Sequence, residues 1–121
     1  MDYPMLIDGA LVDGSRRLDV VDPSTGEVFA HCACASATDI DAAVAAAAAA
    51  FPKWSGTSIE TRHALMQKMA EAIETNIDTL ARTLTSEQGK TLADAIAEVG
   101  GAAYFLRYFA QTSLPVQVLE D

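Results

Sequence analysis

Short apolar runs separated by turn residues fill the first third of the chain. Residues 5–7 and 10–12 are apolar and flank Asp8-Gly9, a dipeptide that tolerates the positive φ angles of a tight hairpin turn. A second pair of runs, residues 18–21 and 27–34, flanks residues 22–26, where proline presets φ for a turn and glycine supplies a left-handed exit. The pattern predicts β-hairpins over residues 1–35.

From Thr38 onward the spacing of apolar residues changes from two to about 3.6, which is typical of amphipathic helices. The pattern predicts four helices within residues 38–111. Three of them are expected to begin at a threonine that stands three residues before an acidic side chain: Thr38 and Asp41, Thr57 and Glu60, Thr91 and Asp94. Pro52 is expected to interrupt the first helix, and Gly89 to end the third.

The order of these elements predicts an α/β fold. With 121 residues and 50% of them hydrophobic, the chain can bury one ordinary core, so we expect one domain or one piece of a larger domain. Residues 114–121 have the pattern of the start of a strand and end without a cap or a polar tail. We therefore expect the chain to continue in a longer protein.

Charge narrows the classes of partner. Eight Lys and Arg stand against 17 Asp and Glu, which gives a net charge of −9 and repels phosphate backbones and anionic headgroups. No stretch approaches the length of a membrane span, and the amino terminus lacks the basic start and apolar run of a secretory signal. We expect no nucleic acid and no membrane as partner.

Two cysteines, Cys32 and Cys34, are too few for a disulfide framework, so a reducing, cytoplasmic location is the expectation. We expect their side chains to point to opposite faces of the predicted strand. A metal or redox site at this pair is one reading of the motif, but structural zinc needs four ligands and the sequence offers no second pair. Small apolar residues in a partly buried strand are the simpler interpretation.

The search for self-contained catalytic chemistry is negative. The sequence has no glycine-rich phosphate loop, no H-E-x-x-H motif and no G-x-S-x-G motif. His31 and His63 lie far apart in sequence and in elements of different type, so an acid–base or metal pair is not indicated. No catalytic and no cofactor-binding residue is predicted.

Six segments, taken in order, carry a family resemblance. They are Ile7-Asp8-Gly9 with Val12-Asp13, residues 21–28 (VDPSTGEV), residues 39–54 from Asp39-Ile40-Asp41 to Trp54, then Arg62 with Leu65 and Met66, residues 85–99 around Glu87-Gln88-Gly89-Lys90, and residues 105–110 (FLRYFA). Together they resemble the amino-terminal segment of the NAD(P)-dependent aldehyde dehydrogenase superfamily. The resemblance covers almost the whole chain.

The resemblance implies a segment of hairpins and helices that belongs to the cofactor domain and packs beside its Rossmann-like part. In this family the catalytic Cys, the general-base Glu, the oxyanion Asn and the cofactor loops come later in the chain. The full-length enzyme is expected to bind NAD or NADP, to take a small aldehyde and to form homo-oligomers. The present segment is expected to act as scaffold and substrate-tunnel wall, to contact the remainder of its own chain, and to be inactive and without cofactor when alone.

Two further roles are implied only by the resemblance. Alignment on residues 105–110 places Ala97 and Gly101 on the wall of the substrate tunnel, where small side chains suit a bulky or elongated aldehyde. The alternative for Gly101 is close packing of two helices. The carbonyl groups of Val20 and Val21 with Glu87 match a monovalent cation site of some relatives, although a turn hydrogen-bond network would use the same residues.

A stand-alone acidic module remains as a competing hypothesis. In it, the aromatic face at residues 104–109 would bind a partner protein. Such a module should be monomeric and unfold cooperatively, whereas a piece of a larger domain should expose apolar helix faces and associate.

Overall fold

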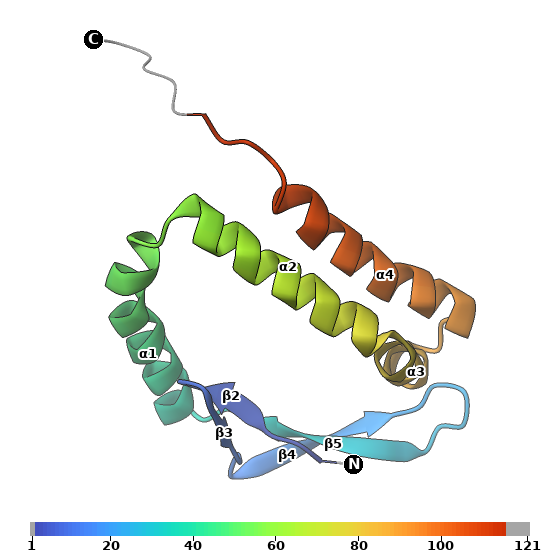
Figure 1. Cartoon of the computed structure of the whole chain (residues 1–121). Coiled ribbons are helices and arrows are strands. Elements are labelled where there is room, and N and C mark those ends of the chain that lie inside the picture. Colours follow the sequence, from blue (N-terminus) through green and yellow to red (C-terminus); the bar gives the residue numbers. More distant parts are fainter. Residues whose placement is uncertain (1, 116–121) are drawn as a thin grey trace.

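The computed structural model describes residues 2–115 (Figure 1). Within them, β-structure comes first in the chain and helices follow, as expected for the α/β class. The strands are β1 (Asp2–Tyr3), β2 (Met5–Ile7), β3 (Ala10–Val12), β4 (Arg16–Val21) and β5 (Val28–Cys34). The helices are α1 (Ala37–Ser55), α2 (Ile59–Thr75), α3 (Ile77–Gln88) and α4 (Leu92–Phe109).

Both predicted hairpins are confirmed. β2 and β3 pair antiparallel around Asp8 and Gly9, whose φ angles are 51° and 76°. β4 and β5 also pair antiparallel, with a register shift between Val20 and Val21. The alternating pattern missed β1, which pairs parallel with β5 in a three-stranded sheet of order β1-β5-β4. A two-residue strand paired with one about 30 residues later leaves no local signal in the sequence.

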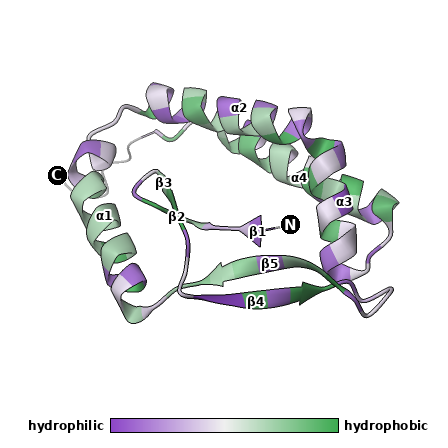
Figure 2. Cartoon of the chain, turned by 90° about the horizontal axis from the view of Figure 1, so that it is seen from below, coloured by the Kyte–Doolittle hydropathy of each residue, from purple (hydrophilic) through white to green (hydrophobic). Residues whose placement is uncertain are grey.

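α2, α3 and α4 lie on one side of the three-stranded sheet (Figure 1). α2 and α4 lie side by side, α3 crosses between them and the sheet, and α1 stands apart at the end of the β2–β3 hairpin. Coloured by hydropathy, α1 carries apolar residues along much of its length (Figure 2). No residue of α1 is buried.

The core is built from small side chains. Its buried apolar residues are Ala30, Ala70, Ala81, Ala95, Ala103 and Ala110. Among the described residues, no large side chain is fully buried, while Phe51, Tyr104 and Phe105 are each at least 60% exposed. Alanine contacts let α2, α3 and α4 approach closely, but they bury little apolar area, and apolar area is the main source of folding free energy.

Two helix starts differ from the prediction. α1 begins after Ser36, whose hydroxyl accepts from the Asp39 amide at 3.3 Å while the Asp39 carboxylate accepts from the Ser36 amide at 2.8 Å. This capping box replaces the predicted pair of Thr38 with Asp41. α2 begins after Ser58 rather than Thr57, and the Ser58 hydroxyl accepts from the Thr61 amide at 3.2 Å.

Pro52 does not end α1, which continues to Ser55. Proline removes one backbone donor and crowds the carbonyl four residues earlier, but only residues 53–55 of α1 follow Pro52, so little of the helix lies beyond the disruption. The α1 end is satisfied by other groups, because the Arg62 guanidinium donates from Nη2 to the carbonyls of Trp54 at 3.1 Å and Ser55 at 2.8 Å. A side chain seven residues beyond the helix therefore provides the cap that local sequence did not reveal.

The carboxyl-terminal helices agree more closely with the pattern. Gly89 ends α3 with a left-handed φ of 73°, and Thr91 caps α4 by accepting from the Asp94 amide at 3.2 Å. α4 ends at Phe109, two residues before the predicted limit. The predicted strand at 114–121 falls mostly on residues 116–121, which lie outside the described part of the chain. None of the helices in residues 2–115 is long and apolar enough to cross a bilayer.

Candidate functional site

The outward face of α4 carries the predicted tunnel residues. Ala97, Gly101, Tyr104 and Tyr108 follow one another at intervals of four, three and four, so they form one stripe on the helix. The stripe lies opposite the buried alanines of α4, Ala95 and Ala103. A Cβ added to Gly101 would meet nothing within 4 Å, so Gly101 does not serve close helix packing within the described residues. Gly100 does face a neighbour, since its added Cβ would lie 3.7 Å from Ile77 Cδ1.

Two edge-to-face aromatic pairs extend this face toward the end of α4. The rings of Tyr104 and Phe105 are 5.7 Å apart, and those of Tyr108 and Phe109 are 5.2 Å apart. All four side chains are more than half exposed. A contiguous apolar face of this kind marks a contact surface in a larger structure.

The candidate cation ligands come only partly together. Val20 and Glu87 line one pocket of about 280 Å³ between the sheet and α3, but Val21 is not among its lining residues. The register shift between Val20 and Val21 skips Phe29, so the extra residue of this irregularity lies on β5 and not on β4. Among the described residues, no three His, Cys, Asp or Glu side chains form a metal-binding group.

The turn between β4 and β5 has its own hydrogen-bond network. The Asp22 carboxylate accepts from the Ser24 hydroxyl at 2.6 Å and from the Ser24 amide at 2.8 Å, and the Gly26 amide donates to the Asp22 carbonyl at 2.7 Å. The bonds from Ser24 hold the pKa of the Asp22 carboxyl below its ordinary value. The Asp-Pro-Ser-Thr-Gly segment is thus a fully bonded turn.

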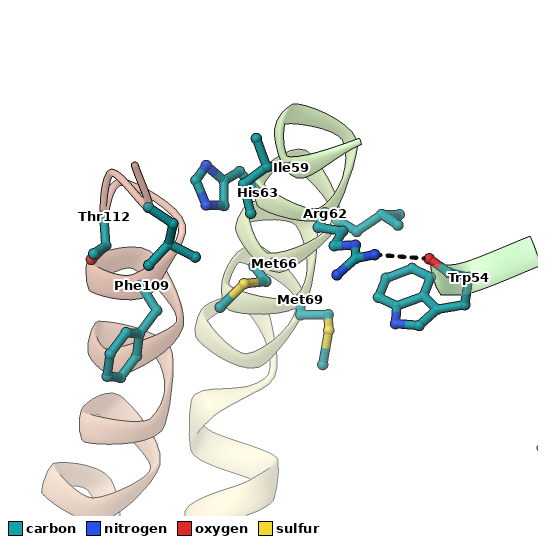
Figure 3. Close-up of a pocket in the computed structure, with 10 residues that line it drawn as sticks. Trp54, Ile59, Arg62, His63, Met66, Met69, Phe109 and Thr112 are labelled. Atoms are coloured by element: carbon teal, nitrogen blue, oxygen red, sulfur yellow. Dashed lines mark hydrogen bonds between the residues drawn. The ribbon is translucent and has the colours of Figure 1, made fainter. Parts of the chain in front are cut away.

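An apolar groove lies where α1, α2 and the end of α4 meet. Figure 3 shows Trp54, Met66, Met69 and Phe109 around it, with Arg62 beside Trp54. The Arg62 guanidinium carbon is 5.5 Å from the Trp54 ring centroid, which is a cation–π contact. Arg62 thus caps α1 through Nη2 and lies over Trp54, while its Nε is buried with no hydrogen-bond partner among the described residues. Sequence reasoning missed this groove, since its walls come from three separate elements.

The histidines are separate, as expected. His31 lies on β5 between two carboxylates, with Nδ1 3.4 Å from Asp2 and Nε2 3.4 Å from Asp19. His63 lines the apolar groove on α2. The described residues therefore bring no acid–base pair of histidines together.

The expectation that the two cysteines point to opposite faces is wrong. Cys32 and Cys34 are alternate residues of β5, and alternate strand residues point to the same face. The ladder with β4 is regular here, with Cys32 opposite Leu18 and Cys34 opposite Arg16. Both thiols are free and half-buried.

Comparison with known proteins places these features in a family. The aldehyde dehydrogenase family model matches residues 11–117. The chain is 38% identical over 109 residues to 2-aminomuconic semialdehyde dehydrogenase of Bos taurus, covering 89% of this chain and 22% of that protein. It is 42% identical over 98 residues to mitochondrial acylating methylmalonate-semialdehyde dehydrogenase of Arabidopsis thaliana, covering 79% of this chain and 16% of that protein.

Solved structures similar to this fold come from the same family. The crystal structure of an NAD-dependent aldehyde dehydrogenase from Sinorhizobium meliloti superposes with a TM-score of 0.87 and 38% identity, covering 91% of this chain and 23% of that one. The chain thus spans about a fifth of the length of the curated relatives that it matches. With the family model matching nearly its whole length, the chain belongs to the aldehyde dehydrogenase family.

Proposed function

We propose that this chain is the amino-terminal part of the cofactor-binding domain of an NAD(P)-dependent aldehyde dehydrogenase that oxidises an aldehyde to a carboxylic acid. The observation that carries the proposal is the alanine core beside many exposed large apolar side chains. Such a surface suits a segment that is completed by further chain. The relatives support this reading, and they give no support to a stand-alone interaction module.

The proposed substrate is a small aldehyde, and within that class one that also bears a carboxylate. Both relatives described above are named for semialdehydes. Ala97 and Gly101 are the proposed tunnel-wall residues, and the open space at Gly101 supports a wide passage for an elongated aldehyde. A tunnel formed partly by α4 would need its opposite wall from the remainder of the chain.

The catalytic groups and the cofactor site are proposed to lie outside this segment. Each of the four helices has an acidic side chain in its first turn, Asp39, Glu60, Asp78 and Asp94. A carboxylate there opposes the binding of a pyrophosphate by the helix N-terminus. These four helix N-termini therefore do not fit the pyrophosphate of a nicotinamide dinucleotide. We expect neither NAD nor NADP to bind the segment alone.

We also propose a monovalent cation site between β4 and α3. Val20, Val21 and Glu87 are its proposed ligands, and the pocket that Val20 and Glu87 share supports them. Hard oxygen ligands suit sodium or potassium. Flame emission of the purified full-length protein after exhaustive dialysis, with Glu87→Gln as the variant, tests the site.

The remaining parts of the proposal concern partners and location. The remainder of the chain and the other subunits of a homo-oligomer are the proposed protein partners. A cytoplasmic location stays a prediction that rests on cysteine usage alone. Fractionation of source cells with an antibody to this segment tests it.

One comparison tests the proposed function. The 121-residue chain and the full-length product of its gene are each assayed for reduction of NAD and NADP with a panel of semialdehydes. We expect activity only in the longer protein. Reduction of either cofactor by the 121-residue chain, or no aldehyde oxidation by a longer protein that carries it, would overturn the proposal.

A further inference from the structure

We infer that Cys32 and Cys34 form a two-thiol site for trivalent organic arsenicals on the helix-facing side of β5. The inference is independent of the proposed dehydrogenase activity, because it uses only side chains of this sheet. It commits to a two-thiol ligand chemistry, since the described residues offer no third soft ligand beside the pair.

The first observation is the shared face. Cys32 and Cys34 are two residues apart in a strand whose pairing with β4 is regular from Arg16 to Leu18. Both side chains therefore leave the strand in the same direction, one pleat repeat apart. Neither thiol forms a disulfide. Two thiols on the same face of a strand can both bond to one soft atom, whereas two thiols on opposite faces cannot.

The second observation is the pocket beside Cys32. Tyr3, Phe29 and Ala30 line it together with Cys32, and its volume is about 280 Å³. These three neighbours supply aromatic and apolar surface next to the sulfur. An aryl or alkyl group carried by the arsenic can bury its apolar area there.

Access and charge also fit this ligand. Both cysteines are only half-buried, so part of each residue is open to solvent. The chain carries a net charge of −9, which disfavours anionic ligands. An organic arsenic(III) oxide or its hydrate is uncharged and is not repelled.

The reaction balances without an oxidant or a reductant. Two S–H bonds of the cysteines and the arsenic–oxygen bonds of the oxide break, two S–As bonds form, and the oxygen leaves as water with both thiol protons. Arsenic stays trivalent throughout. Chelation by two thiols on one rigid strand is favoured over binding by two separate thiols, because the second bond forms at high effective concentration.

The first test uses the reduced 121-residue chain and phenylarsine oxide. We expect one phenylarsenic group per chain by intact mass, the loss of both free thiols in a thiol titration, and retention against excess glutathione but not against dimercaptopropanol. Two arsenicals per chain, one thiol still free, or removal by glutathione would overturn the inference.

The second test separates shared geometry from the mere number of thiols. Cys32→Ser and Cys34→Ser each leave one thiol, and Ala33→Cys combined with Cys34→Ser keeps two thiols but places them on opposite faces of β5. We expect all three variants to bind phenylarsine oxide more weakly by about a hundredfold, the lower end of the gain from linking two sites. If the variant with Ala33→Cys and Cys34→Ser binds phenylarsine oxide as tightly as the wild type, the two thiols need not share a face, and the inference is overturned.

A third measurement addresses the pocket and does not depend on variants. Inorganic arsenite lacks the ring, so we expect phenylarsine oxide to bind the native chain more tightly than arsenite, and the difference to disappear in denaturant. If phenylarsine oxide is preferred over arsenite to the same degree in the native and the denatured chain, binding depends on the sequence motif alone. That result would overturn the role of the folded strand.

Discussion

Gly89 packs against Pro23 so closely that a methyl group on Gly89 would lie 2.8 Å from Pro23 Cγ. This contact joins the turn between β4 and β5 to the junction of α3 and α4, two segments more than 60 residues apart in sequence. The two segments that carry much of the family resemblance are therefore in direct contact. Glycine is required at position 89 for two reasons, the contact and the left-handed φ of 73°.

Gly89→Ala is predicted to destabilise the fold. A left-handed φ costs a non-glycine residue about 1 kcal/mol or more, and the clash with Pro23 adds to it, so we expect a loss of about 2–3 kcal/mol. The thermal midpoint by circular dichroism measures it. Gly101→Ala is the matched control, because it lies in a helix with nothing within 4 Å, and we expect it to stabilise by about 0.5–1 kcal/mol. Equal effects of the two substitutions would contradict the contact.

Ser36→Ala is predicted to weaken the start of α1. The substitution removes the hydroxyl that accepts from the Asp39 amide, and loss of such a cap costs about 1 kcal/mol. Thr38→Ala, at the position predicted from sequence, is the control and should change the helix content measured by circular dichroism far less. A larger effect at Thr38 would indicate that Thr38, and not Ser36, caps the helix.

The ion pair between α2 and α4 is predicted to make stability fall in acid. Arg107 donates to both Glu74 oxygens, from Nε at 2.8 Å, and this bond holds the pKa of the Glu74 carboxyl below its ordinary value of 4.5. A lowered pKa in the folded state means that the stabilisation is complete above about pH 4.5 and is lost as the pH falls through the lowered value.

Arg107→Gln should therefore flatten the dependence of the thermal midpoint on pH below 4.5. Arg82→Gln is the control: among the described residues Arg82 pairs with Asp78 of its own helix, and that bond lowers the pKa of Asp78 from its ordinary value of 3.8, so its loss should flatten the curve only below about pH 3.8. If both variants alter the acid limb equally, the pair across α2 and α4 has no special role in packing.

Filling the outward stripe of α4 is predicted to alter substrate selection in the full-length protein. Ala97→Leu and Gly101→Leu would narrow the proposed tunnel, so we expect KM for an elongated semialdehyde to rise about tenfold, which corresponds to about 1.4 kcal/mol, while a two-carbon aldehyde is little affected. Ala45→Leu, on the exposed face of α1, is the matched control for adding volume to a helix surface. A uniform loss of kcat for all aldehydes would argue for misfolding instead of a tunnel wall.

Local chemistry explains which elements could be predicted from sequence. Three signals depend only on neighbouring residues and were predicted correctly: the turn at Asp8-Gly9, the end of α3 at Gly89 and the start of α4 at Thr91. The start of α1 differs from the prediction because Ser36 with Asp39 and Thr38 with Asp41 have the same spacing. Only the structure shows that Ser36 is the cap.

The features that were missed depend on contacts distant in sequence. The parallel pairing of β1 with β5 and the Arg62 cap on α1 join residues brought together by the fold. The shared face of Cys32 and Cys34 is different, since the period of two along a strand contained that information. For the candidate site, the stripe of Ala97 and Gly101 follows from helical spacing, whereas the opposite wall that the proposed tunnel would need cannot be derived from helical spacing.

A core made of alanine has a consequence for the order of events on the ribosome. If a protein as long as the relatives is made from its amino terminus at about 5–20 residues per second, this segment waits tens of seconds for the strands and helices that would cover Phe51, Tyr104 and Phe105. During that interval its apolar faces are open to chaperones and to other nascent chains. Variants that enlarge those faces should therefore lower the yield of folded protein before they alter its stability.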